Sequence, residues 1–330
     1  MNAPTAPDSN VRAWLPGFLA VAVIWGASFL FIKIGVRELH PMYVALGRVV
    51  AGALTLLVAL AVLRDRLPRD PKLWLHMVVV AAVGVALPFT LFGYGEQRVS
   101  SILAGIWNAT TPLVVLPMAV LVFRTERMTA RRAIGMTLGF LGVLVVLGAW
   151  RGLGGAEFTG QLLCFAAAAC YGLSIPYQKR FVAGRSESGV ALSAAQLLVA
   201  AGQLVIVAPL VAGAPPAPTS LSFDVVVSVL ALGALGTGLA FVINLRTIRL
   251  AGASTASTVT YLIPIFAVLI GVIALDEQLA WYQPVGAVIV LAGVAVSQRL
   301  LVRRRSRPDP DPAVAPHQTT EPAVPRVTAG

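Results

Sequence analysis

Charged residues are scarce in this 330-residue sequence, where they make up 12% of the chain against 58% apolar residues. No soluble domain of this length presents so apolar a surface to water. The two cysteines and three histidines show no metal-ligand spacing, and Cys164 and Cys170 are expected to be small apolar residues of one helix. No GxxxxGK[ST] loop occurs, so the chain is not expected to hydrolyse ATP.

Aspartate, glutamate and histidine are missing from the middle of every apolar segment. An intramembrane protease, a metal-dependent synthase or a lipid-phosphate transferase needs such residues at or near a membrane face. We therefore expect neither an enzyme nor a cofactor. A dedicated carboxylate for proton coupling is missing as well, which leaves facilitated exchange, coupling through the substrate's own protonation and proton antiport all open.

The apolar residues form runs of about twenty, the length of helix that crosses about 30 Å of hydrocarbon. The runs are continuous, so an alternating β-barrel pattern is excluded. The sequence predicts an all-α integral membrane protein with ten transmembrane helices. The expected spans are 14–36, 41–63, 73–94, 100–123, 132–150, 158–178, 189–212, 223–245, 252–275 and 281–301.

Basic residues are distributed unevenly between the two sets of loops. With a cytoplasmic N-terminus, nineteen lysines and arginines fall in inner segments, and only Arg37, Arg98 and Arg151 fall in outer loops. Because basic residues collect on the cytoplasmic side, both termini are expected there. The net charge of +11 is explained by this topology, and no nucleic-acid partner is expected.

The second half of the chain repeats the first. Pro112 matches Pro264 at a shift of 152, and Glu126 matches Glu277 at a shift of 151. Other matches are Ala104/Ala256, Gly135/Gly286, Gly142/Gly293, Gly84/Gly236, Phe89/Phe241, Lys33/Lys179, Trp25-Gly26-Ala27-Ser28 with Tyr171-Gly172-Leu173-Ser174 and, more weakly, Arg48/Gln196. Five spans per repeat is an odd number, so the halves must be inverted. The loop RTERMTARR is basic and its counterpart DEQ is acidic, which supports the inversion independently.

WGASFLFIKIG at 25–35, Pro41 with Arg48, and the paired proline, glutamate and glycine positions resemble the EamA family of the drug/metabolite transporter superfamily. The resemblance covers residues 14–301. It implies ten spans in two five-helix halves, a central cavity lined by helices 1–4 and 6–9, and peripheral helices 5 and 10. Family members are permeases for amino acids, metabolites, drugs or nucleotide sugars, so the resemblance does not choose a substrate.

Arg48 is the main candidate for substrate binding, because it lies eight residues into the second span with apolar neighbours. A charge at membrane depth is costly unless it is paired or faces a cavity. One interpretation is a side chain that reaches toward the interface or ties spans together through carbonyl groups. The other is a fixed positive charge that faces the cavity and favours an anionic or carboxylate-bearing substrate.

Uncharged polar and aromatic residues at membrane depth complete the candidate substrate-binding set, with helix packing as the alternative for each. They are Trp25, Ser28, Asn108, Thr111, Tyr171, Ser174, Gln196, Asn244, Thr260 and Tyr261. Lys33 and the glycine row 135, 139 and 142 are expected to be structural. Glu126 and Glu277 are expected to cap helices, Glu277 at the start of span 10, and Tyr94 and Glu96 to lie at the outer interface.

The sequence thus predicts a cytoplasmic lead (1–13), repeat 1 (14–150), repeat 2 (158–301) and a proline-rich cytoplasmic tail (302–330). We expect a secondary transporter that moves a small metabolite, amino acid or drug-like solute across the cytoplasmic membrane by alternating access, with export favoured. A membrane-embedded enzyme, a channel or an importer is the alternative. The expected partners are this solute and the lipid bilayer, and a homodimer is left open. Many arginines and alanines beside few lysines point to a bacterial source.

Overall fold

The computed structural model describes residues 11–151 and 155–297, and every regular element in these ranges is helical. Nine helical stretches there are long and apolar enough to cross a membrane. The tenth span is the shorter helix α14 (Tyr282–Ser297), and residues 298–301 of its predicted range lie outside the described residues. The predicted tail 302–330 and most of the lead 1–13 also lie outside them.

Each predicted span corresponds to one helix or to a stack of shorter helices. The first five spans are α1 (Val11–Gly35), α2 (Pro41–Val62), α3 (Pro71–Ala81) with η1 (Ala82–Ala86) and α4 (Leu87–Glu96), α5 (Ser101–Asn108) with α6 (Thr111–Pro117) and η2 (Met118–Val122), and α7 (Ala130–Leu147). The second five are α8 (Gly155–Phe181), α9 (Gly189–Ala212), α10 (Phe223–Gly233) with η5 (Ala234–Leu239) and α11 (Ala240–Ala251), α12 (Ala253–Ser257) with α13 (Val259–Leu275), and α14.

Helix starts follow ordinary capping chemistry. The Asp70 carboxylate accepts a 2.9 Å hydrogen bond from the backbone N–H of Lys72, and Pro71 occupies the first position of α3. The Ser100 hydroxyl accepts from the backbone N–H of Leu103 at the start of α5. Such side chains satisfy donors that have no partner within the helix.

Two π-helical turns interrupt equivalent spans of the two halves. The turn η1 lies in span 3 and η5 in span 8, and a shift of 152 maps residues 82–86 of η1 onto 234–238 of η5. A π turn widens the helix and is common at functional sites. The two turns therefore extend the sequence repeat into the backbone.

Spans 4 and 9 are also each broken, but at a shift of 152 the break in span 9 lies three to four residues before that in span 4. The helix α5 ends at Asn108 and α6 begins at Thr111, whereas α12 ends at Ser257 and α13 begins at Val259. The predicted segment 100–123 corresponds to one span, Ser101–Val122, which is interrupted at residues 109 and 110. Pro112 lies in the first turn of α6, where a missing N–H costs little.

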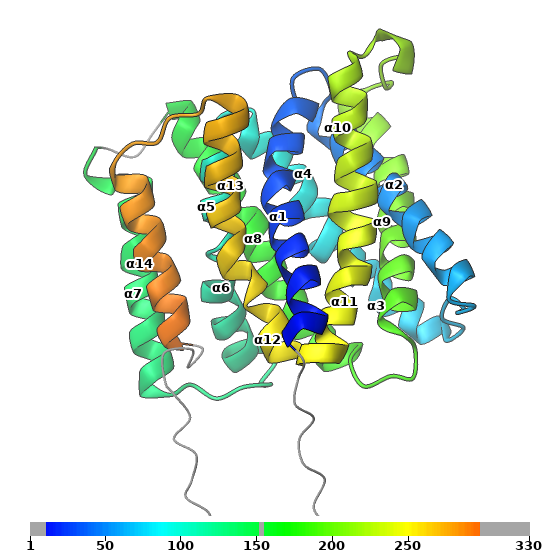
Figure 1. Cartoon of the computed structure of the whole chain (residues 1–330), viewed down its shortest axis with the longest axis horizontal. Helices are drawn as coiled ribbons and strands as arrows, with labels where there is room; N and C mark the ends of the chain where they lie inside the picture. Colours follow the sequence, from blue (N-terminus) through cyan, green and yellow to red (C-terminus); the bar gives the residue numbers. More distant parts are fainter. Residues whose placement is uncertain (1–10, 152–154, 298–330) are drawn as a thin grey trace, which may run out of the picture.

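The start of α1 and the end of α14 lie at the same end of the bundle, here called the near end; the opposite end is the far end (Figure 1). The connection between η2 and α7 lies at the near end, and the connection between α13 and α14 lies at the far end (Figure 1). These two connections are repeat-equivalent, so the two halves are inverted relative to each other.

The pair α7 and α14 lies at one edge of the bundle (Figure 1) and packs backbone against backbone. A Cβ atom on Gly135 would lie 2.5 Å from the carbonyl oxygen of Gly293, and one on Gly286 would lie 2.6 Å from the amide nitrogen of Val146. Small residues permit such close helix contacts in membranes. The structural interpretation of the glycine row and the peripheral position of these two helices are confirmed.

Candidate functional site

Arg48 is buried where α2 meets the two π turns, with 8% of its surface exposed. Its Nε donates a 2.9 Å hydrogen bond to the Thr237 hydroxyl of η5. Its guanidinium carbon lies 3.6 Å from the ring centroid of Phe89, which lies in the first turn of α4, directly after η1. No described residue bonds to its Nη1 or Nη2. Arg48 therefore does not reach the interface, and two of its nitrogens keep their donors available.

The π turn η5 sets the position of Thr237. The hydroxyl of Thr237 donates to the carbonyl oxygen of Leu232, five residues earlier, while it accepts from Arg48. Close packing of α2 on span 8 makes this contact reachable, because a Cβ on Gly233 would lie 2.5 Å from the carbonyl oxygen of Arg48. The π turn and Gly233 thus place the Thr237 hydroxyl within hydrogen-bond distance of Arg48.

Trp25 and Ser28 of α1 face the same π turn. The indole nitrogen of Trp25 donates a 3.1 Å hydrogen bond to the carbonyl oxygen of Gly236, and its ring contacts Phe241 edge-on. Ser28 is buried and donates to the carbonyl oxygen of Ile24 in its own helix. The Trp25 indole therefore ties α1 to span 8, and Ser28 lies beside the same turn, since a Cβ on Gly236 would lie 3.0 Å from its Oγ.

Tyr171 and Ser174 of α8 repeat this arrangement around η1. The ring of Tyr171 lies 6.2 Å from that of Phe92, and Ser174 accepts a hydrogen bond from the side-chain amide of Gln178. Gln196 of α9 joins them, since a Cβ on Gly84 of η1 would contact Ser174 and lie 3.1 Å from Gln196 Nε2. Each half thus places an aromatic residue and a serine against the π turn of the other half.

A cavity of about 390 Å³ opens in the near-end half of the bundle, between the inner parts of spans 4, 5, 6, 9 and 10. Its wall includes three of the predicted residues, Thr111, Thr260 and Tyr261, together with Glu126 and Arg132 at the near end. Thr111 donates its hydroxyl to the backbone carbonyl of Asn108 across the break in span 4.

The structure therefore separates the predicted site residues into two groups. Six surround the π turns, namely Trp25, Ser28, Arg48, Tyr171, Ser174 and Gln196, and three line the near-end cavity, namely Thr111, Thr260 and Tyr261. Asn108 and Asn244 are half-buried and line neither. Among the described residues, no group of three or more His, Cys, Asp or Glu forms a metal-binding cluster.

The two ends of the bundle are packed differently. At the far end, α5 packs on α13, and α1 packs on both α4 and α5. The repeat-equivalent pairs at the near end are α6 with α12, α8 with α11, and α8 with α12. Within the described residues these pairs show no comparable packing. The far end is therefore closed, and the near end is open around the cavity.

Three acidic side chains behave differently from the sequence-based expectation. Glu96 was assigned to the outer interface, yet it is fully buried, and neither carboxylate oxygen bonds to a described residue. Glu277 was assigned to the start of span 10, yet it accepts from the backbone N–H groups of Ser101 and Ile102, so it caps α5. Glu126 caps no helix and pairs with basic side chains instead. The expectation that Glu126 and Glu277 cap helices next to them in the sequence is wrong, because their contacts join spans that lie far apart in the chain.

Lys33 takes the structural role that was expected. Its ammonium group donates to the carbonyl oxygens of Glu96 (2.6 Å) and Val99 (2.7 Å), where span 3 ends. These hydrogen bonds fasten the far end of α1 to the far end of span 3. Cys164 is buried as expected, whereas Cys170 is only half-buried.

Two aspartates outside the spans tie the halves together at the near end. The Ser188 hydroxyl and the backbone N–H of Arg66 hydrogen-bond to Asp65 and lower the pKa of its carboxyl. The backbone N–H of Lys72 lowers the pKa of Asp70, which also pairs with Arg185 at 2.6 Å.

Several known proteins with related sequences carry the word transporter in their names. The uncharacterized transporter YoaV of Bacillus subtilis (strain 168) is 24% identical over 291 residues, which cover 88% of this chain and 98% of the relative. The uncharacterized inner membrane transporter YedA of Escherichia coli (strain K12) is 28% identical over 271 residues, which cover 79% and 83%.

The fold also has a counterpart among solved structures. One crystal structure is similar with a TM-score of 0.61 and 19% identity, covering 88% of this chain and 97% of that chain. The model of the EamA-like transporter family matches residues 12–148 and again residues 158–298, one match for each half. With its two inverted halves and its family match on each, the chain belongs to the EamA-like transporter family.

Proposed function

We propose that the protein is a secondary transporter in which two inverted halves alternately expose one central site to either side of the membrane. The observation that carries this proposal is the unequal packing of the two ends. Helices pack against one another at the far end, whereas their counterparts at the near end do not pack comparably within the described residues, and a cavity of about 390 Å³ opens there beside α6, α8 and α12. Inverted halves that are open at one end and closed at the other correspond to one endpoint of such a cycle.

The near end faces the cytoplasm in this proposal, because basic residues collect on the cytoplasmic side of a membrane. Arg64, Arg66 and Arg69 follow α2 at this end, and Arg124 and Arg127 follow span 4. The structure then corresponds to an inward-facing state in the cytoplasmic membrane of a bacterium. Export is favoured on the precedent of the family, with a metabolite, an amino acid or a drug-like solute as substrate.

Arg48 supplies the recognition chemistry of the central site. A planar guanidinium binds a carboxylate through two parallel hydrogen bonds, and the Nη1 and Nη2 atoms of Arg48 bond to no described residue. Trp25, Phe89 and Tyr171 provide aromatic surface from three spans. These groups together favour a small solute that carries an anionic group and an apolar or aromatic part.

The test begins with the purified protein and a thermal-stability screen against amino acids, organic acids and drug-like cations. Stabilising compounds are then loaded, in radiolabelled form, into liposomes that contain the protein. We expect saturable flux that is accelerated by unlabelled solute on the opposite side, because exchange through one site requires it. Flux proportional to concentration would indicate a channel, and chemical conversion of the solute would indicate an enzyme. Either result would overturn the proposal.

A further inference from the structure

The transport cycle needs contacts that hold each end closed in turn, and the far end of this structure shows one such set. Glu277 follows span 9 and accepts from the Ser101 N–H (2.8 Å), the Ser101 hydroxyl (2.8 Å) and the Ile102 N–H (3.1 Å) at the start of span 4. Lys33 on span 1 donates to the carbonyl oxygens of Glu96 and Val99. Here a carboxylate and an ammonium group join backbone ends of spans 1, 3, 4 and 9.

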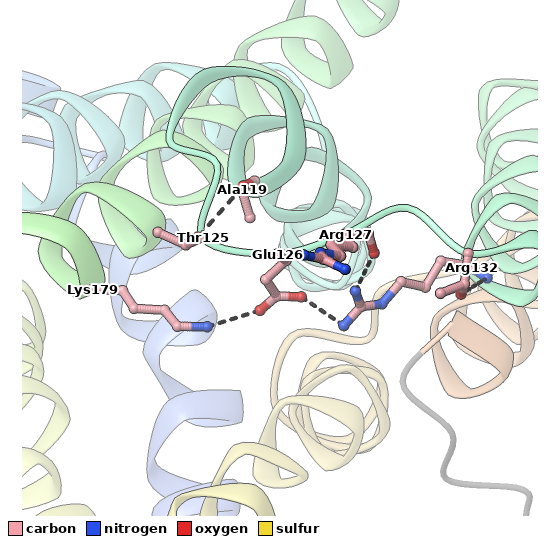
Figure 2. Close-up of polar contacts among 7 residues, drawn as sticks. Ala119, Thr125, Glu126, Arg127, Arg132 and Lys179 are labelled. Atoms are coloured by element: carbon pink, nitrogen blue, oxygen red, sulfur yellow. Dashed lines mark hydrogen bonds and ion pairs between the residues drawn. The ribbon is translucent and has the colours of Figure 1, made fainter.

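The repeat supplies the same two residue types at the near end. Glu126 is the repeat equivalent of Glu277, and Lys179 is the repeat equivalent of Lys33. Their contacts differ from those of the far-end pair. Lys179 Nζ lies 3.0 Å from Glu126 Oε1, and Arg132 Nη2 lies 2.7 Å from Glu126 Oε2 (Figure 2). The two near-end residues thus bind each other and the Arg132 side chain, whereas the two far-end residues bind backbone groups and, for Glu277, also the Ser101 hydroxyl.

The closing partners of the near-end pair follow from the repeat shifts. Glu96 and Val99 correspond to Ile248 and Ala251 at the end of span 8, and Ser101 and Ile102 correspond to positions 253 and 254 at the start of span 9. In the structure α8 does not pack closely on α11 or α12 within the described residues. The contacts that hold the far end closed are therefore unmade at the near end.

We propose that Lys33 with Glu277 and Lys179 with Glu126 are the two gates of the transporter, and that the Glu126–Lys179 ion pair exists only while the near end is open. When the near end closes, Lys179 leaves Glu126 and donates to the carbonyl oxygens of Ile248 and Ala251. Glu126 then accepts from the backbone N–H groups at positions 253 and 254. At the same time the far-end contacts of Lys33 and Glu277 break. This inference rests on the proposed function and adds the residues that switch.

Charge exchange separates a gate from an ordinary salt bridge. The double variant Glu126→Lys, Lys179→Glu keeps an ion pair for the open near end. It places an acceptor where carbonyl oxygens need a donor, and a donor where N–H groups need an acceptor. The double variant also carries Arg132→Gln, so that the new lysine at position 126 has no arginine beside it. The comparison variant is Arg132→Gln alone.

Accessibility is read from single cysteines in a chain that also carries Cys164→Ala and Cys170→Ala. Met136→Cys reports on the near-end cavity, and Ile102→Cys reports on the closed far end, where Ile102 packs against Gly271. A thiol-specific maleimide labels each cysteine in membrane vesicles. Size-exclusion chromatography of each purified variant confirms that it is folded.

In the charge-exchange variant, Met136→Cys is expected to react at least as fast as it does in the comparison variant. Labelling of Ile102→Cys and transport are both expected to fall by roughly tenfold or more. The reason is that the charge-assisted hydrogen bonds that hold the near end closed are lost. Lys33→Met is expected to act in the opposite direction and to raise Ile102→Cys labelling by a similar factor. The pair Asp70→Asn with Arg185→Gln removes another near-end ion pair that lies outside both proposed gates, and is expected to leave both labelling rates within about twofold.

If the charge-exchange variant shows the same labelling rates and the same transport as Arg132→Gln alone, the gate assignment is overturned. A static ion pair would be restored by reversal of its two charges. Unchanged Ile102→Cys labelling in folded Lys33→Met would overturn the assignment at the far end. Both results leave the proposed function intact if the unmodified protein still shows saturable exchange. Failure of that exchange removes the proposed function itself, so the two failures are distinguishable.

Discussion

Replacement of Arg48 by methionine is expected to weaken substrate binding strongly while leaving the protein about as stable as before. The hydrogen bond from Arg48 to Thr237 is worth about 1.5–3 kcal/mol as a bond to a charged group, and the contact with Phe89 about 0.5–2 kcal/mol. Burial of a charge that has no carboxylate partner among the described residues costs several kcal/mol. These contributions nearly cancel, so the net change in the free energy of unfolding is small.

The effect on substrate is expected to be larger. Loss of a charge-assisted hydrogen bond to an anionic group removes about 1.5–3 kcal/mol of binding energy, which is roughly a 10- to 150-fold rise in the half-saturation concentration. Thr237→Val serves as the matched control, since it removes the acceptor of the Arg48 hydrogen bond and keeps the charge. We expect its half-saturation concentration to rise by less than about tenfold.

Two measurements check this prediction on the same preparations. Thermal unfolding in detergent gives the change in stability, and flux into liposomes gives the half-saturation concentration for an anionic solute found in the stability screen. A folded Arg48→Met protein with unchanged transport would refute the role of Arg48 in binding. A large loss of stability with the remaining transport unaltered would show that Arg48 is a structural tie between α2 and η5.

Three further outcomes are expected. Gly293→Ala should lower the melting temperature, because the added Cβ would meet the backbone of α7 within 2.6 Å and overpacking costs about 1–3 kcal/mol; Gly202→Ala, with nothing within 4 Å, should leave it unchanged or slightly raised. The Glu96→Gln variant should fold and melt at the same temperature as the wild type or higher, because it removes a buried carboxyl without a hydrogen-bond partner. A marked loss of folded protein would contradict this prediction. The Asp65–Ser188 contact lowers the pKa of Asp65 from 3.8; the advantage of wild type over Asp65→Asn in thermal unfolding should therefore be present at neutral pH and disappear as the pH falls below about 4.

The long apolar runs and the repeat carried most of the fold prediction. A run of about twenty apolar residues has few structures available in a membrane, so the spans follow from composition. The matched positions Pro112/Pro264 and Glu126/Glu277 divided the ten predicted spans into two sets of five. Because five is an odd number, the two halves had to be inverted. The α7–α14 contact followed as well, because glycines spaced along a membrane helix favour backbone contact.

The π turns could not be predicted from the residues. A π turn adds one residue to a helical turn, and the hydropathy of a uniformly apolar segment does not record this. Gly84 and Gly236 were visible as a matched pair, but they indicated a repeat and not a widened helix. The contacts of Arg48 with Phe89 and Thr237 depend on these turns, so its partners were missed although Arg48 itself was identified.

The contacts of Glu96, Glu126 and Glu277 were missed for another reason. Each lies near the end of a span, where a sequence predicts an exposed or capping carboxylate. Their actual surroundings come from spans far away in the chain, such as Lys179 beside Glu126 and Ser101 beside Glu277. Sequence position limits how deep such a residue lies, but helix packing decides which groups meet it.

The most direct test of the account is the sidedness of two repeat-equivalent loops. Single cysteines are introduced as Arg127→Cys and Gln278→Cys in the background that lacks Cys164 and Cys170, and an impermeant maleimide is applied to right-side-out and inside-out vesicles. Inverted halves predict that the cysteine at 127 reacts only in inside-out vesicles and the cysteine at 278 only in right-side-out vesicles. Reaction of both cysteines from the same side would contradict the inverted arrangement, and with it the transport cycle.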